Sequence, residues 1–231
     1  MDTEPIHVYK YTAVMVEPRE HKAYKYVLNN FLENLSDEWG FVLFHGNKNK
    51  DFVKNIISEL TPEYSKRILE LVHLNVGNLD LHTYSYLLKD SIFYQYIPSE
   101  MFLIFQTDSI ILPKNKLLIN NFLQYDYVGA PWVSNNTVGN GGLSLRRKSK
   151  MLEIIQNKGY LPGYEDTYFV LNHNVKCNIP DYTISKYFSI ETMYNDTAFG
   201  SHKCWGYLTK PQLDYLIVNN SEIQELIDLQ N

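Results

Sequence analysis

The chain has 231 residues, of which 45% are hydrophobic and 14% aromatic, and its formal net charge is −5. This length and composition predict one globular domain spanning residues 1–231. The acidic balance argues against a nucleic-acid-binding protein, because such proteins usually carry a basic face. Two cysteines, Cys177 and Cys204, are too few for a disulfide framework. We expect a cytoplasmic protein, because no signal peptide opens the chain and no apolar run reaches the roughly 18 residues of a transmembrane segment.

Strands and helices alternate in the first part of the chain. The predicted strands are Tyr11 to Val16, Phe41 to Phe44 and Ile68 to Leu74, and the predicted helices are Lys22 to Leu35, Asp51 to Leu60 and Leu81 to Lys89. Strands joined through helices form a mostly parallel sheet that is covered by helices on both faces. The sequence therefore predicts an α/β fold.

In the stretch Met101 to Leu112, a fourth predicted strand ends on the polar step Gln106-Thr107-Asp108, and apolar residues flank the step on both sides. Ligands of open α/β sheets bind at the carboxyl ends of the strands. A lone carboxylate placed there favours a cation or a phosphate-bearing partner for Asp108.

The pattern changes after Leu112, and the remaining half is predicted to be rich in loops. Its predicted elements are a short helix at Leu117 to Leu123, a glycine turn at Gly139 to Gly142, an apolar run at Leu143 to Leu145 and a helix at Lys148 to Gln156. The glycine turn either lets the backbone approach a ligand closely or is a plain tight turn. The basic run Arg146 to Lys150 is interpreted as a solvated helix start, with a phosphate contact as the alternative.

Two further segments carry groups with chemistry. Glu165 and Asp166 stand where a loop enters a short helix, so they are either helix caps or a general base for an acceptor hydroxyl. His202 is either a hydrogen-bonded filler or, with a carboxylate, a ligand suited to Mn²⁺. Lys203 could neutralise a leaving phosphate.

Taken in chain order, these segments resemble a family of small nucleotide-sugar glycosyltransferases of the GT-A type. The matching motifs are FQTDS at Phe105 to Ser109, YDYVGAPW at Tyr125 to Trp132, GNGGLSLR at Gly139 to Arg146 and the acidic pair Glu165-Asp166, followed by HKCW at His202 to Trp205. The first two strand ends also fit, so the resemblance covers nearly the whole chain. It extends to glycosyltransferases of chlorella-virus type that decorate capsid protein, which would place the protein in the host cytoplasm.

The resemblance implies transfer of a hexosyl or deoxyhexosyl group from a nucleotide sugar, expected to be a UDP-sugar, to a hydroxyl of a glycan or glycoprotein. Such enzymes hold the pyrophosphate through Mn²⁺ or Mg²⁺ on an Asp-x-Asp step. Here Gln106 stands in place of the first Asp, which leaves Asp108 as the anionic ligand and His202 as the residue that completes the metal shell. A non-catalytic module that binds nucleotide or carbohydrate is the alternative.

The resemblance also implies a role for each site residue. Residues 1–112 would form a nucleotide-binding half and residues 113–231 an acceptor half. The expected nucleotide-binding residues are Val14, Val16, Arg19, His45, Tyr84, Gln106, Asp108 and Lys203, and the expected sugar- or acceptor-binding residues are Trp132, Gly141, Gly142 and Trp205. If the transfer inverts configuration, Asp166 would be the base, and Glu165 would orient it or bind acceptor hydroxyls. If configuration is retained, the acidic pair would instead position the donor or the acceptor.

Overall fold

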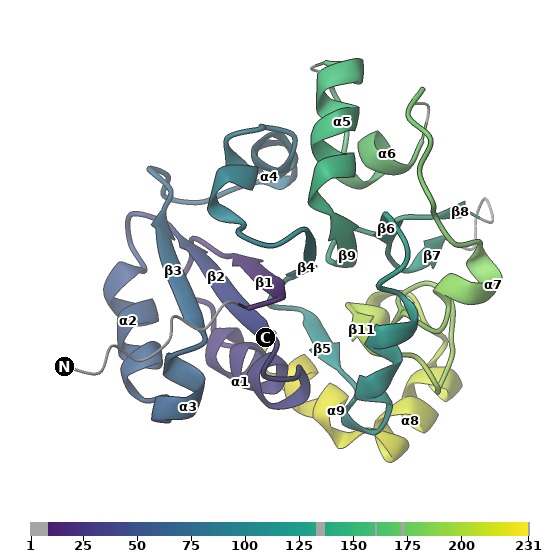
Figure 1. Cartoon of the computed structure of the whole chain (residues 1–231). Helices are drawn as coiled ribbons and strands as arrows, with labels where there is room; N and C mark the ends of the chain where they lie inside the picture. The colour runs from purple at the N-terminus through teal and green to yellow at the C-terminus, as the bar shows by residue number, and fades with distance from the viewer. Residues whose placement is uncertain (1–8, 133–136, 160, 172–173, 231) are drawn as a thin grey trace.

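The computed structural model describes residues 9–132, 137–159, 161–171 and 174–230. The prediction that no signal peptide opens the chain concerns residues 1–8, which lie outside the described residues. A six-stranded sheet forms the centre of the molecule (Figure 1). Its strands, in spatial order, are β3 (Ile68–His73), β2 (Trp39–His45), β1 (Tyr11–Val16), β4 (Met101–Phe105), β9 (Leu143–Arg147) and β6 (Tyr127–Val128). The first four of these lie parallel, whereas β9 is antiparallel to both of its neighbours. The predicted mostly parallel sheet is confirmed.

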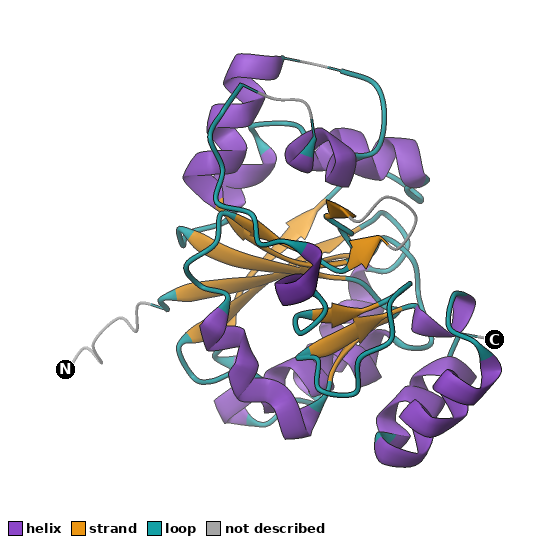
Figure 2. Cartoon of the chain, turned by 90° about the vertical axis from the view of Figure 1, so that its right-hand side faces the viewer, coloured by secondary structure: helices purple, strands orange, loops and turns teal. Residues whose placement is uncertain are grey.

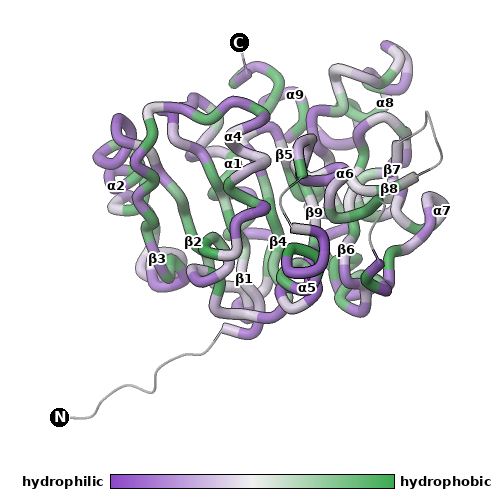
Figure 3. Tube along the Cα trace, turned by 90° about the horizontal axis from the view of Figure 1, so that it is seen from above, coloured by the Kyte–Doolittle hydropathy of each residue, from purple (hydrophilic) through white to green (hydrophobic). Residues whose placement is uncertain are grey.

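Alternate residues of the central strands pack into two separate cores, one on each face of the sheet. In β1, Ala13 and Met15 belong to one core, whereas Val14 and Val16 belong to the other. This division follows from the two-residue period of side chains along a strand. Because both faces are covered, every residue of β1 is buried. Figure 3 shows hydrophobic residues running along these central strands.

Helices cover both faces of the sheet, as the sequence predicts (Figure 2). The first core receives side chains from α1 (Tyr24–Asn34), α2 (Lys50–Ser58), α3 (Pro62–Ser65), α8 (Lys210–Asn219) and α9 (Ser221–Asp228). The second core receives them from α4 (Leu81–Leu88), the 3₁₀ turn η1 (Phe93–Tyr96), α5 (Lys148–Lys158) and α6 (Glu165–Val170). None of the described helices is both long and apolar enough to cross a bilayer.

The fourth strand ends before the polar step, as the sequence predicts, and the apolar residues after the step form a separate strand in a second sheet. β4 ends at Phe105, and the backbone N–H of Ser109 donates to the carbonyl of Gln106 at 3.0 Å, which closes a turn. The chain then enters β5 (Ser109–Ile111), which pairs antiparallel with β11 (Gly200–His202), and β11 pairs in parallel with β10 (Ser189–Ile190). In this small sheet His202 lies opposite Ser109. The turn therefore brings Asp108 next to His202.

The second half holds more regular structure than the sequence predicts. The short helix expected at Leu117 to Leu123 is a 3₁₀ helix, η2 (Pro113–Asn121). The elements that the sequence analysis does not predict include α7 (Tyr182–Ser185), α8, α9, the 3₁₀ turn η3 (Cys204–Gly206) and the hairpin of β7 (Pro131–Trp132) and β8 (Thr137–Val138). Cys177 and Cys204 are both free thiols, as expected.

Candidate active site

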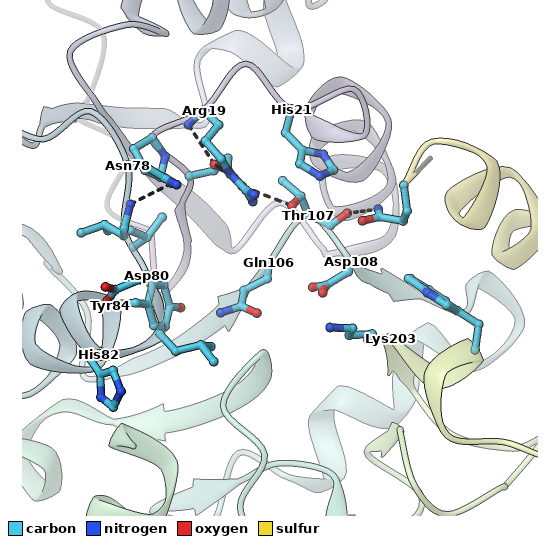
Figure 4. Close-up of a pocket in the computed structure, with 17 residues that line it drawn as sticks. Arg19, His21, Asn78, Asp80, His82, Tyr84, Gln106, Thr107, Asp108 and Lys203 are labelled. Carbon is cyan, nitrogen blue, oxygen red and sulfur yellow. Dashed lines mark hydrogen bonds and ion pairs between the residues drawn. The ribbon is translucent and has the colours of Figure 1, made fainter. Parts of the chain in front are cut away.

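A cleft with two adjoining lobes opens at the carboxyl ends of β1 and β4. The lobes have volumes of about 820 and 600 Å³. Both are lined by Leu81, Tyr84, Gln106, Asp108 and Lys203, so these residues stand where the lobes meet. Figure 4 shows the first lobe, with Gln106 and Asp108 between Tyr84 on one side and Lys203 on the other.

Asp108 has a buried carboxylate oxygen that is not hydrogen-bonded. Its Oδ1 accepts no hydrogen bond from any described residue. His202 Nε2 lies 3.2 Å from this oxygen, which is an ion-pair distance without the alignment of a hydrogen bond. Burial alone would raise the pKa of Asp108, but the imidazolium of His202 holds it below its ordinary value. The carboxylate is therefore ionised at neutral pH, and its Oδ1 is paired with His202 by charge but not by an aligned hydrogen bond.

His202 belongs to a chain of polar contacts. Its Nδ1 lies 3.1 Å from Glu191 Oε1, and Asn140 Nδ2 donates to the same oxygen at 2.6 Å. Burial lowers the pKa of His202, but the carboxylates of Asp108 and Glu191 outweigh this and raise it to about 9. The sequence analysis singled out neither Glu191 nor the side chain of Asn140. No local motif marks Glu191, which simply follows the short strand β10.

The glycine turn brings the backbone close to side chains of the protein itself. A Cβ atom on Gly142 would overlap the imidazole ring of His202, and one on Gly141 would overlap the carboxylate of Glu165. Within the turn, only Gly139 has a left-handed φ, of 144°. Close approach is thus the reason for Gly141 and Gly142, and the turn fixes where His202 and Glu165 can stand.

Arg146 and Glu165 form a buried ion pair beneath the second lobe. Arg146 Nη1 donates to Glu165 Oε2 at 2.7 Å and Nη2 donates to Oε1 at 3.0 Å, while Nε donates to Ser144 Oγ at 2.9 Å. The guanidinium also lies over the rings of Tyr127 and Phe169. The interpretation of Arg146 as part of a solvated helix start is therefore wrong, since its side chain is 0% exposed. The carboxylate of Glu165 balances its charge inside the protein.

Asp166 is the second residue of α6, and it lines the second lobe. Its Oδ1 accepts a hydrogen bond from the backbone N–H of Thr167 at 2.6 Å. Burial, followed by the nearby carboxylate of Glu165, raises the pKa of Asp166 to about 7. Asp166 can therefore exchange a proton near neutral pH.

Arg19 faces the first lobe from the loop after β1. Glu17 is buried at the end of that strand, and its Oε1 and Oε2 accept hydrogen bonds from Arg19 Nε and Nη2 at 2.8 and 2.7 Å. Thr107 Oγ1 donates to the same carboxylate at 3.3 Å. The Arg19 side chain is 53% exposed, so a ligand can reach its guanidinium. Glu17, which the sequence analysis did not assign to the site, holds it in place.

The other residues expected at the site are divided between the cleft and the core. Val16 and Trp205 line the first lobe, Trp132 lines the second, and Tyr84 lines both. Two of the expected residues, Val14 and His45, line neither of the described lobes. Val14 is buried in the second core, and His45 is buried at the end of β2, where its ring stacks on His73.

Loop and terminal residues that no motif marks complete the first lobe. Asn78, Asp80 and His82 line it from the segment that begins α4. Gln230, after α9, also lines it, and its Nε2 donates to the carbonyl of Thr107 at 2.8 Å. The first lobe thus combines residues from both halves of the chain.

This architecture is the GT-A fold. The chain is similar to the galactosyltransferase LgtC, solved in complex with donor and acceptor sugar analogs, with 11% identity over 95% of each chain and a TM-score of 0.55. It is also similar to residues 1–349 of S. aureus TarS, solved in complex with UDP-GlcNAc, with 11% identity over 96% of this chain and 70% of that chain and a TM-score of 0.53. At this identity the likeness shows a shared fold.

The chain belongs to the family described as "Protein of unknown function (DUF5672)". The family model matches residues 70–202, which is more than half of the chain. This range contains Asp108, Asp166 and His202, whereas β1 and β2 lie outside it. No curated protein matches the chain.

Proposed function

We propose that the protein is a glycosyltransferase that moves a sugar from a nucleotide-sugar donor to a hydroxyl of a glycan or glycoprotein. The observation that carries the proposal is the two-lobed cleft, in which the Asp108 carboxylate stands at the junction and Asp166, with a pKa of about 7, stands in the second lobe. One lobe suits the donor nucleotide and the other suits the acceptor. The donor sugar would then lie at the junction.

The first lobe is suited to a nucleoside diphosphate. Arg19 offers a guanidinium held in a fixed orientation by Glu17, and Lys203 offers a second cation at the junction. Cations of this kind neutralise phosphate oxygens. Tyr84 offers a ring on which a base could stack, and the expected base is uracil. These contacts support a UDP-sugar, with a hexosyl or deoxyhexosyl group, as the donor.

The residues at the junction fit a divalent ion such as Mn²⁺ or Mg²⁺. Asp108 Oδ1 accepts no hydrogen bond from a described residue, and His202 Nε2 lies 3.2 Å away, close enough for both atoms to bind one ion. The described residues contain no cluster of three His, Cys, Asp or Glu side chains that could hold a metal, so the amide of Gln106 and the diphosphate would supply the remaining ligands. When bound, the ion would stabilise the negative charge that grows on the leaving diphosphate.

Asp166 would act as the general base of an inverting transfer. The acceptor oxygen forms a bond to the anomeric carbon as the bond from that carbon to the diphosphate oxygen breaks, and Asp166 takes the proton of the hydroxyl. A base with a pKa near 7 is matched to neutral conditions. The buried pair of Arg146 and Glu165 holds the start of α6, which carries Asp166. Trp132 could stack on a sugar face in the same lobe.

Calorimetry with UDP, with and without Mn²⁺, tests the donor side. We expect Mn²⁺ to strengthen UDP binding and Asp108→Ala to remove this effect of the metal. The control Asp214→Ala, at an exposed residue, should behave as the wild type. Tight binding of UDP that is indifferent to Mn²⁺ would contradict the role of Asp108.

Hydrolysis of a panel of UDP-sugars tests the reaction. We expect slow turnover of one donor, which Asp166→Asn abolishes while UDP binding persists. Unchanged turnover in Asp166→Asn would reject the base. Nucleotide binding without turnover of any donor or acceptor would instead favour the non-catalytic binding module. The capsid acceptor and the cytoplasmic location remain predictions.

A further inference from the structure

Glu191 lies behind His202, on the side of the ring that faces away from Asp108. Glu191 Oε1 is 3.1 Å from Nδ1, whereas Asp108 Oδ1 is 3.2 Å from Nε2. The two nitrogens of an imidazole ring point to opposite sides. A group bound at Nε2 therefore meets Asp108 but lies beyond the reach of Glu191. Glu191 is buried and lines the second lobe.

The two contacts of the ring differ in kind. The contact of Nδ1 with Glu191 has the geometry of a hydrogen bond. The contact of Nε2 with Asp108 does not, since Asp108 Oδ1 accepts no hydrogen bond among the described residues. The ring is thus oriented so that Nδ1–H donates to Glu191 and Nε2 is directed toward the junction of the lobes.

Glu191 is itself fixed by a polar chain that leads back to Asp108. Asn140 Nδ2 donates to Glu191 Oε1 at 2.6 Å, and Asn140 Oδ1 accepts from the backbone N–H of Gly142 at 3.0 Å. Ser109 Oγ donates to the carbonyl of Gly142 at 2.9 Å and accepts from the backbone N–H of Gln106 at 3.2 Å. The same chain therefore sets the orientation of His202 and the turn that carries Asp108.

We infer that Glu191 is a positioning residue, which keeps a proton on Nδ1 of His202 so that a divalent cation, bound together with Asp108, replaces the proton on Nε2. This inference rests on the metal assistance in the proposed function. A carboxylate behind a ligating histidine fixes the orientation of the ring and raises its basicity, and losing such a partner typically costs about 10–100-fold in metal affinity.

Mn²⁺ binding to the protein in the presence of UDP, measured by calorimetry against a blank of UDP alone, tests the inference. We expect Glu191→Ala to weaken binding by about 10–100-fold. Glu191→Gln keeps an oxygen that can accept from Nδ1–H, so it should lose less than Glu191→Ala. Equal affinity in wild type and Glu191→Ala, or an equal loss in both variants, would overturn the inference.

A double-mutant cycle separates positioning from direct ligation. If Glu191 acts through the ring, Glu191→Ala should weaken Mn²⁺ binding in the wild-type background and change nothing further in a His202→Ala background. A similar loss in both backgrounds would show that Glu191 acts on the ion by another route and would overturn the inference.

The tautomer of His202 provides a readout that needs no metal. Nitrogen-15 NMR of the metal-free protein, at a pH where the ring is neutral, should show a proton on Nδ1 in the wild type and a shift toward Nε2 in Glu191→Ala. A proton on Nε2 in the wild type would overturn the inference. If the wild type shows the Nδ1 proton but binds no Mn²⁺ in the presence of UDP, the metal assistance in the proposed function fails and the tautomer assignment stands.

Discussion

Replacing Arg146 by methionine should destabilise the protein strongly. The change removes the two hydrogen bonds, of 2.7 and 3.0 Å, that Glu165 accepts from the guanidinium. Glu165 is only 4% exposed, so its carboxylate would remain buried without a partner. Breaking a buried ion pair by removing one partner costs about 3–5 kcal/mol. For a domain of this size, that loss corresponds to a fall in Tm of roughly 6–20 °C.

Urea unfolding of three variants tests this reasoning. The exposed pair of Lys210 and Asp214, with side chains 84% and 56% exposed, is the matched control. Lys210→Met should change the free energy of unfolding by less than about 1 kcal/mol, because exposed pairs contribute little. The double variant Arg146→Met/Glu165→Leu should recover most of the loss, since it leaves no uncompensated charge.

Two results would refute the argument. The first is a loss in Arg146→Met no larger than the loss in Lys210→Met. The second is a double variant no more stable than Arg146→Met alone. Either result would mean that the buried carboxylate of Glu165 does not depend on Arg146 for its charge balance, and that the pair does not anchor the start of α6.

Three further predictions concern Gly142, His202 and Asp166. Gly142→Ala should lower the free energy of unfolding by about 1–3 kcal/mol, because the added Cβ would overlap the ring of His202. In the control Gly77→Ala the added Cβ meets nothing within 4 Å, so the free energy of unfolding should change by less than about 0.5 kcal/mol. Equal effects of the two substitutions would contradict the role of the turn. Because the folded pKa of His202, about 9, lies above its ordinary 6.5, its stabilising contribution should be full below pH 6.5 and lost as the pH rises toward 9. Urea unfolding of the metal-free protein at pH 6.5 and pH 9 should show this loss of stability in the wild type and not in His202→Gln. The same loss in both proteins would contradict the stabilising role of His202. If Asp166 is the base, kcat/KM for donor turnover should rise with pH to a plateau with an apparent pKa near 7, and a flat profile across that range would argue against this role.

Local sequence patterns predicted the first half of the fold well. The apolar strand Tyr11–Val16 and the helix Leu81–Leu88 lie where their composition and flanking residues place them. The position of Asp108 at the end of β4 also follows from the sequence, since an apolar run that meets polar residues tends to end there. The place of β5 in a second sheet could not be predicted, because strand-like residues lie on both sides of the turn and only the pairing with β11 assigns the later ones to another sheet.

The residues that could act at the site were visible in the sequence, but their state was not. The sequence by itself marked Asp108, Asp166 and His202, because local motifs place such groups at strand ends and helix starts. Only the tertiary structure decided that Glu165 forms a buried ion pair with Arg146, and that Glu191 contacts Nδ1 of His202. Both contacts join residues from different elements, and burial removes the water that would otherwise weaken them. Periodicity along the chain therefore determines the elements and offers the candidates, whereas packing decides which charges are matched and which remain free.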